Sequence, residues 1–317
     1  MFIEQAFKSL HEPWRYLVGT FIIIIFWMFI GQGPLTIVLM VKYLTSGSNQ
    51  MPSSMQDIMA ASEISSNLFI FLLLLSFAIG LLGIWLVVRF LHKQPFKALT
   101  TTRKKIDWKR IILSFSLMAI FIIVSTLIDY LWQPEDYVFQ FQFKPFVVLL
   151  IISILFVPLQ TSFEEYFFRG YLMQGLGVIS RNRWFPLLFT SLVFGGLHYF
   201  NPEVMQFGPW IMLYYIGTGL FLGVLTLMDD GMELSLGFHA ANNLIAILLV
   251  TADWTAFQSH SIFKQISEPE GAGSELIMSF LILYPILLIV FSKKYRWKNW
   301  QEKLLGKVTA PEGPIIE

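Results

Sequence analysis

Apolar residues fill the chain in long runs that are separated by short polar connections. A helix that crosses a bilayer needs about 20 mostly apolar residues, and runs of about that length recur along the sequence. They predict an all-α, polytopic membrane protein that forms a single membrane-embedded domain, residues 1–317, with eight transmembrane helices. The eight predicted spans are residues 16–41, 67–91, 111–132, 146–176, 184–200, 208–228, 234–252 and 275–292.

Composition supports this assignment and removes several classes of chemistry. Hydrophobic residues make up 56% of the chain and charged residues 14%, whereas roughly 25% of a soluble domain is charged. The net charge of +1 gives no field that would attract nucleic acid. The chain has no cysteine, which excludes disulfides, thiol nucleophiles and cysteine-ligated zinc.

Lysine and arginine are distributed unevenly among the polar connections. If the N-terminus is cytoplasmic, all but three of the 22 lysines and arginines fall on inside segments, and the three outside are Lys42, Lys144 and Lys264. Cytoplasmic connections of membrane proteins are enriched in these two residue types, so we expect both chain ends in the cytoplasm. We expect residues 308–317 to form a flexible tail.

Two acids and an arginine interrupt the fourth apolar run, in the stretch SFEEYFFRG (residues 162–170). The sequence stays apolar beyond them, so the helix is predicted to continue to about Gly175, which places Glu164 roughly 16 Å from the cytoplasmic end. Glu165 and Arg169 are spaced to form an ion pair on one helix face. Glu164 is predicted to have no partner on its own helix, and an acid at this depth indicates a functional site. The alternative is that these charges mark an interfacial helix end.

Two histidines lie inside other apolar runs. His198 ends LVFGGLH, where Phe194 is one helical turn earlier and can pack on its ring. His239 and Asn243 are four residues apart and share a helix face. Polar groups within a membrane face the bundle interior or a water-filled cavity, so we expect these side chains to meet Glu164 in one cavity. A single histidine of this kind is often only a structural hydrogen-bond partner.

This set of side chains is suited to peptide hydrolysis. Glu164 and His198 could deprotonate a water molecule, because a carboxylate without a partner in a medium of low dielectric can take a proton and return it. His239 and Asn243 could donate hydrogen bonds to the oxyanion that forms. In the alternative, Glu164, both histidines and Asn243 would hold a zinc ion whose bound water attacks the peptide.

The three motifs resemble those of the CPBP intramembrane peptidases, the CAAX protease and bacteriocin-processing family. EEYFFRG (164–170) is similar to the family motif EExxxR, FGGLH (194–198) to FxxxH, and HAANN (239–243) to HxxxN. Each motif is weak alone, but the three occur in order on the fourth, fifth and seventh predicted helices. The resemblance covers about 80 residues, from 164 to 243.

The resemblance implies an eight-helix bundle around a cytoplasm-facing cavity, with the catalytic core in residues 146–252. It implies that Glu164 is the general base, that His198 helps to activate the water, and that His239 and Asn243 stabilise the oxyanion. Members of the family have been described both with and without a metal. We expect no cofactor, and the alternative is zinc bound by Glu164, His198 and His239. The supporting residues of the site are Glu165, Arg169 and Phe194.

The sequence therefore predicts an intramembrane endopeptidase that acts on membrane-associated protein or peptide substrates and has the lipid bilayer as its surroundings, with no nucleic-acid partner. The short loops favour a multi-pass protein of a bacterial plasma membrane. One alternative is a non-catalytic scaffold or immunity protein that binds a membrane partner. Another is a proton-coupled transporter, whose proton relay would also use glutamate and histidine.

Overall fold

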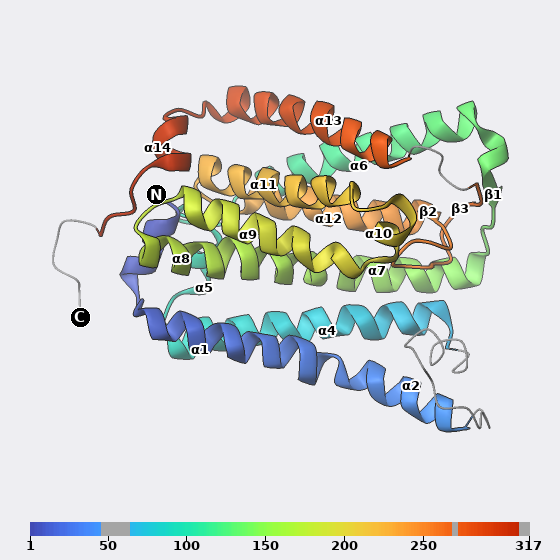
Figure 1. Ribbon diagram of the computed structural model, residues 1–317, viewed down its shortest axis with the longest axis horizontal. Coiled ribbons are helices and arrows are strands. Elements are labelled where there is room, and N and C mark those ends of the chain that lie inside the picture. The colour runs from blue at the N-terminus through green and yellow to red at the C-terminus, as the bar shows by residue number, and fades with distance from the viewer. Residues whose placement is uncertain (46–63, 268–271, 311–317) are drawn as a thin grey trace.

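The computed structural model describes residues 1–45, 64–267 and 272–310, with only the backbone described for 272–279. Its long helices run antiparallel and form one elongated bundle (Figure 1). Most of the predicted tail lies outside the described residues. Its first residue, Val308, is buried, and its backbone N–H donates to the carbonyl oxygen of Arg181 over 3.0 Å.

The first half of the chain supplies four long helical segments, and three of them are extended or interrupted by a π-helical turn. These turns follow α1, α4 and α7. The elements of this half are η1 (Ile3–Lys8), α1 (Pro13–Ile24), η2 (Ile25–Gly31), α2 (Gly33–Thr45), α4 (Ser66–Leu86), η3 (Val87–Leu91), α5 (Phe96–Thr100), α6 (Trp108–Trp132), η4 (Pro134–Asp136), β1 (Tyr137–Phe139) and α7 (Phe143–Glu165).

The second half completes the bundle with shorter helices. Its elements are η5 (Tyr166–Leu172), α8 (Met173–Ser180), α9 (Trp184–Leu197), η6 (His198–Phe200), α10 (Pro202–Phe207), α11 (Ile211–Asp229), α12 (Glu233–Leu249), β2 (Val250–Thr251), β3 (Phe263–Gln265), α13 (Ala272–Tyr295) and α14 (Trp300–Leu305).

Five helical segments of the described chain are long and apolar enough to cross a membrane: Pro13–Thr45, Ser66–Leu91, Trp108–Trp132, Phe143–Ser180 and Ile211–Asp229. Two of the other predicted spans are shorter apolar helices, Trp184–Phe200 and Glu233–Leu249. The chain is thus a multi-pass, mainly helical membrane protein. The two short helices carry His198 and His239, whereas the helix that carries Glu164 and Glu165, Phe143–Ser180, is one of the five long segments.

A small sheet, which the all-α prediction did not include, joins connections at one end of the bundle. β3 is its central strand and pairs antiparallel with β1 and parallel with β2. Backbone N–H and C=O groups in connections need partners when they pack over an apolar bundle, and short strand pairing supplies them. We call this end of the molecule the cavity end.

The opposite end carries η1, α5, α14 and residues 89–110, with most of the lysines and arginines, and we call it the basic end (Figure 1). Lys42, Lys144 and Lys264 all belong to the segments at the cavity end. The charge asymmetry predicted from the sequence is therefore an asymmetry between the two ends of the bundle.

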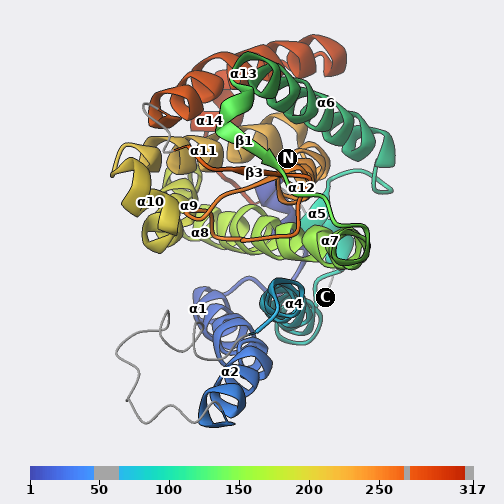
Figure 2. The same ribbon diagram turned by 90° about the vertical axis from the view of Figure 1, so that its right-hand side faces the viewer.

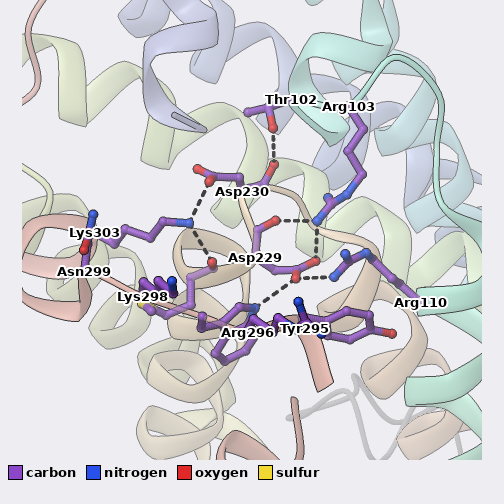
Figure 3. A pocket seen from close by; sticks show the side chains of 12 residues that line it. Thr102, Arg103, Arg110, Asp229, Asp230, Tyr295, Arg296, Lys298, Asn299 and Lys303 are labelled. Atoms are coloured by element: carbon purple, nitrogen blue, oxygen red, sulfur yellow. Dashed lines mark hydrogen bonds and ion pairs between the residues drawn. The ribbon is translucent and has the colours of Figure 1, made fainter. Parts of the chain in front are cut away.

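Buried ion pairs fix the turn between α11 and α12 at the basic end. Figure 3 shows Asp229 between two arginines, with distances of 2.9 Å to Arg103 and 2.5 Å to Arg110. Arg103 also binds the fully buried carboxylate of Glu233, over 3.0 Å. Lys303 of α14 reaches Asp230 over 2.6 Å. These contacts hold the start of α12, and with it the helical frame that positions His239.

α1, α2 and α4 form a layer that packs on the helix carrying the two glutamates (Figure 2). A side chain in place of Gly80 of α4 would lie 2.6 Å from the ring of Phe163, so the missing Cβ allows this close approach. Phe163 also contacts Trp27, with ring centroids 5.1 Å apart. The residue that precedes Glu164 is therefore fixed by aromatic packing.

Candidate active site

Glu164 and Glu165 are the last two residues of α7, and the chain continues through η5 into α8 without a break. The prediction that this helix runs past the acids is confirmed, and it extends further than expected, to Ser180. The helix widens into a π-helical turn immediately after the acids. Such turns inside α-helices often occur at functional sites.

The expected ion pair between Glu165 and Arg169 is present. Arg169 Nη1 donates to Glu165 Oε1 over 3.0 Å, and both side chains are fully buried. Arg169 Nη2 also donates to the backbone oxygen of Gly219 in α11, over 3.1 Å, and the guanidinium lies 4.2 Å from the centroid of the Phe194 ring. Arg169 thus joins three helices: the α7–α8 segment, α9 and α11.

His239 lies between the two glutamates. Its Nδ1 is 2.9 Å from Glu165 Oε1, and its Nε2 is 3.3 Å from Glu164 Oε2. Because a carboxylate only accepts hydrogen bonds, Nδ1 carries a proton, and in the neutral imidazole Nε2 is then an acceptor. Glu165, expected to pair only with Arg169, therefore also fixes the orientation and tautomer of His239.

The prediction that Glu164 has no partner on its own helix is wrong. Gln160, one turn earlier in α7, donates from Nε2 to Glu164 Oε1 over 2.7 Å. Glu164 keeps 13% of its side chain exposed, whereas Glu165 keeps none. Its second oxygen, Oε2, has no hydrogen-bond partner among the described residues. Glu164 is therefore the glutamate that is oriented but still available to a reacting group.

A row of amides continues from Glu164 toward a cavity. Asn243 Nδ2 donates to Gln160 Oε1 over 3.0 Å, and Asn242 Nδ2 donates to Asn243 Oδ1 over 3.0 Å. The sequence reasoning missed Gln160 and Asn242. The signal for Gln160 was its position four residues before Glu164, on the same helix face, because amides within a membrane need partners as acids do.

His198 follows the last turn of α9, in η6, and its ring orientation is also fixed. Nδ1 lies 2.8 Å from the backbone oxygen of Phe194, so it must carry the proton, which leaves Nε2 of the neutral ring as an acceptor. The imidazole stacks on Tyr215, with centroids 4.4 Å apart. The Phe194 ring contacts both His198 and His239, at 4.9 and 5.9 Å, as expected for a residue that supports the site.

Glu164, Glu165, Arg169 and His239 form a buried cluster, and its formal charges do not cancel when His239 is neutral. Glu164 and Glu165 contribute two negative charges, and Arg169 contributes one positive charge. An uncompensated charge is costly inside a bundle within a membrane. One further proton, on His239 or on Glu164, makes the cluster neutral, and the 3.3 Å approach of these two groups gives that proton two neighbouring positions.

A cavity of about 910 Å³ reaches the site from the cavity end of the bundle. His198, Asn242 and Asn243 line it, together with residues of α6, α10, α11, α12 and the 254–257 connection. The resemblance implied a cytoplasm-facing cavity, whereas the lysines and arginines predict a cytoplasmic basic end. These two expectations conflict in the structure, because the cavity lies at the end opposite the basic residues.

The predicted zinc alternative needs at least three ligands around one point. In residues 1–45, 64–267 and 272–310, no group of three or more histidine, aspartate or glutamate side chains is arranged to hold a metal ion. Of the proposed ligands, Glu164 and His239 approach each other, but no third histidine, aspartate or glutamate of the described residues joins them in a metal-binding arrangement. This geometry does not fit a zinc ion.

Replacement of Gln160 by leucine should lower catalytic efficiency about tenfold, because Glu164 Oε1 and Asn243 both lose the group that orients them. Glu164 itself remains, so residual activity should exceed that of a variant without this carboxylate. The measurement is kcat/KM across a pH series, since a change in the environment of Glu164 should also move the pH profile.

Gln140→Leu is the matched control, because Gln140 also donates hydrogen bonds from its side chain but to the 259–261 connection, away from the site. Equal losses of activity in both variants, with unchanged pH profiles, would contradict a positioning role for Gln160.

Comparison with known proteins identifies the segment that carries this site. Residues 143–245 match the family model described as "Type II CAAX prenyl endopeptidase Rce1-like". The chain is 38% identical over 170 residues to "Uncharacterized protein YyaK" of Bacillus subtilis (strain 168). That match covers 53% of this chain and 57% of the relative, so the two are compared over little more than half of their lengths. No solved structure matches the chain.

The matched segment begins with the first residue of α7 and ends within α12. It contains Glu164, Glu165 and Arg169 on the α7–η5 segment, Phe194 and His198 on α9 and η6, and His239 and Asn243 on α12. The three motifs and the family model therefore agree on one segment. Residues 143–245 are thus similar to the Rce1-like family, in agreement with the resemblance of the motifs to those of the CPBP intramembrane peptidases.

Proposed function

We propose that this chain is an intramembrane endopeptidase that hydrolyses peptide bonds of membrane-associated protein or peptide substrates. One observation carries the proposal: Glu164 is held by Gln160 at one oxygen, and its other oxygen lies 3.3 Å from His239 Nε2 without a hydrogen bond. A bundle stabilised only by packing has no need of this carboxylate, and a buried acid of this kind indicates function.

In the proposed reaction Glu164 takes a proton from water while the resulting hydroxide adds to the carbonyl carbon of the substrate. His198 Nε2, an acceptor in the neutral ring, helps to orient that water. The carbonyl oxygen gains the negative charge, and Asn243 and the protonated form of His239 donate hydrogen bonds to it. When the C–N bond breaks, Glu164 returns its proton to the leaving amine.

His239 needs a second proton to act as a donor, because its first proton is held by Glu165. The charge balance of the cluster supports that protonated form at the stage when Glu164 is a carboxylate. Glu165 and Arg169 would then act only by positioning: the carboxylate holds His239, and the guanidinium holds Glu165.

We further propose that all eight predicted helices cross a bacterial plasma membrane with the basic end in the cytoplasm. The cavity would then open on the outer side, and substrates would enter from there or from the outer leaflet. The absence of cysteine from the sequence makes this testable with single-cysteine variants. Lys105→Cys marks the basic end, and Gln133→Cys marks the cavity wall.

On intact cells a membrane-impermeant maleimide should label Gln133→Cys and leave Lys105→Cys unlabelled until the membrane is opened. Both positions are exposed, so a difference in labelling reports the side of the membrane. The reverse pattern would refute this orientation and place the cavity in the cytoplasm, as the resemblance implied.

The function is tested by comparing peptide termini in membranes of the native host that carries either the wild type or Glu164→Ala at equal protein levels. New termini that appear only with the wild type support the endopeptidase and name its substrate. Identical profiles, together with rescue of a deletion phenotype by Glu164→Ala, would replace the enzyme with the non-catalytic scaffold.

A further inference from the structure

The outer part of the cavity is lined by groups that the proposed reaction does not use. Aromatic rings make up much of its wall, among them Trp132 of α6, Phe207 of α10 and Trp254 of the connection that follows β2. Such rings attract a cation through their faces, and several of them around one space favour a cationic group over an anionic one.

The charged lining residues of this cavity carry one sign only. They are Asp129 of α6 and Glu203 of α10, and none of the residues that line the cavity in the described part of the chain is a lysine or arginine. Neither acid forms an ion pair with any described residue; Lys264, the lysine of the nearby sheet, pairs with Asp253 instead, over 2.8 Å. The cavity therefore holds acids without counter-ions.

Asp129 lies in the last turn of α6, where the helix dipole disfavours a negative charge. Its carboxylate accepts a hydrogen bond from the hydroxyl of Tyr137. A neutral hydroxyl donor orients the carboxylate but leaves its charge uncompensated. A cation brought into the cavity would supply that compensation.

Glu203 is a second acid whose carboxylate has no counter-ion among the described residues. The backbone N–H of Ala256 donates to Oε1 over 2.9 Å, while Oε2 is shielded and has no hydrogen-bond partner among the described residues. Burial raises the pKa of the Glu203 carboxyl, and the hydrogen bond from Ala256 offsets part of that rise. An unpaired acid at this position costs stability unless a ligand completes it.

We propose that the outer part of the cavity binds a lysine or arginine side chain of the substrate, paired with Glu203 and Asp129 among the aromatic rings. This inference rests on the proposed endopeptidase function and names its substrate class: peptides that carry a cationic residue within reach of the scissile bond. The side chain would enter the cavity while the backbone lies near His198 and Asn243.

The test uses the full chain, purified in detergent micelles, and mixtures of lipid-anchored, N-acetylated fluorogenic peptides in which one position is lysine, norleucine or glutamate. The wild type should cleave lysine peptides with at least about tenfold higher kcat/KM than norleucine peptides, the selectivity expected from one compensated charge. Glu203→Gln should reduce this ratio, and Glu203→Gln combined with Asp129→Asn should bring it near one. The control Glu135→Gln removes an exposed acid of the same end that does not line the cavity, and it should keep the wild-type ratio.

A wild type that cleaves lysine and norleucine peptides equally, or a preference that survives in the double variant, would overturn the proposal. In norleucine peptides made without the acetyl group, a preference for the free N-terminal amine would show that the cation is the peptide terminus and that the side-chain form is wrong. Binding of the lysine and norleucine peptides to Glu164→Ala separates this question from catalysis. Selective binding there without any wild-type cleavage would support the cation site and reject the endopeptidase.

Discussion

Replacement of Glu164 by glutamine is expected to lower kcat/KM for peptide hydrolysis by about 10³-fold, the usual contribution of a general base. Glutamine keeps the size of the side chain and an oxygen that can accept the hydrogen bond from Gln160. It cannot take a proton from water. The loss should appear in kcat more than in KM, because the proton is transferred in the transition state.

The same variant should remain folded, and this separates a catalytic residue from a structural one. When His239 is neutral, Glu165 and Arg169 already balance each other, so Glu164 adds the uncompensated negative charge and its removal relieves a buried charge rather than breaking a pair. The measurement is the unfolding midpoint of the purified protein beside the activity assay. Glu164→Gln with near-wild-type activity, or inactive only because it fails to fold, would reject its role as the base.

The residues of the candidate site could be recognised in the sequence because polar residues are rare within membranes. Glu164, Glu165 and Arg169 stood out inside an apolar run, and the same was true of His198, His239 and Asn243. Spacing within one helix also predicted the Glu165–Arg169 pair and the packing of Phe194 on His198. These are local relations, and helix geometry fixes them.

Relations between helices could not be predicted in the same way. The sequence contains nothing that shows His239 facing both glutamates, because the order of α7 and α12 around the bundle depends on packing along their whole lengths. Gln160 was missed for a different reason: an amide lacks charge and is easily read as part of the apolar run. Its role is visible only when Asn243 from another helix completes its hydrogen bonds.

For the side of the membrane on which the cavity opens, the placement of lysine and arginine and the family resemblance lead to opposite expectations. α9 and α12 are shorter than the five long helical segments, and they stop at the cavity end of the bundle (Figure 1). The connections 201–207 and 250–265 and the three-stranded sheet cover that end, and the cavity lies beneath them. If the basic end is cytoplasmic, as proposed, a substrate reaches Glu164 from the outer side of the membrane.

Arg169→Met should be the most destabilising single change in the site, lowering the free energy of unfolding by about 3–5 kcal/mol. It leaves the fully buried Glu165 carboxylate without its cation, removes the hydrogen bond to Gly219 and empties the space against Phe194. We expect the unfolding midpoint in detergent to fall by about 10 °C. Arg89→Met is the matched control, because Arg89 is exposed and forms no ion pair with a described residue, and its midpoint should not move.

Adding Glu165→Gln to Arg169→Met distinguishes the buried pair from simple loss of packing. The second change removes the uncompensated charge, while the glutamine oxygen can still accept a hydrogen bond from His239 Nδ1. The double variant should therefore be more stable than Arg169→Met alone and recover at least half of the loss, although its activity should stay low because His239 no longer faces a charged partner. A double variant that is no more stable than Arg169→Met would show that Arg169 stabilises the bundle by filling space. In that case charge neutrality of the cluster, on which the proposed proton transfer depends, would not be what stabilises the site.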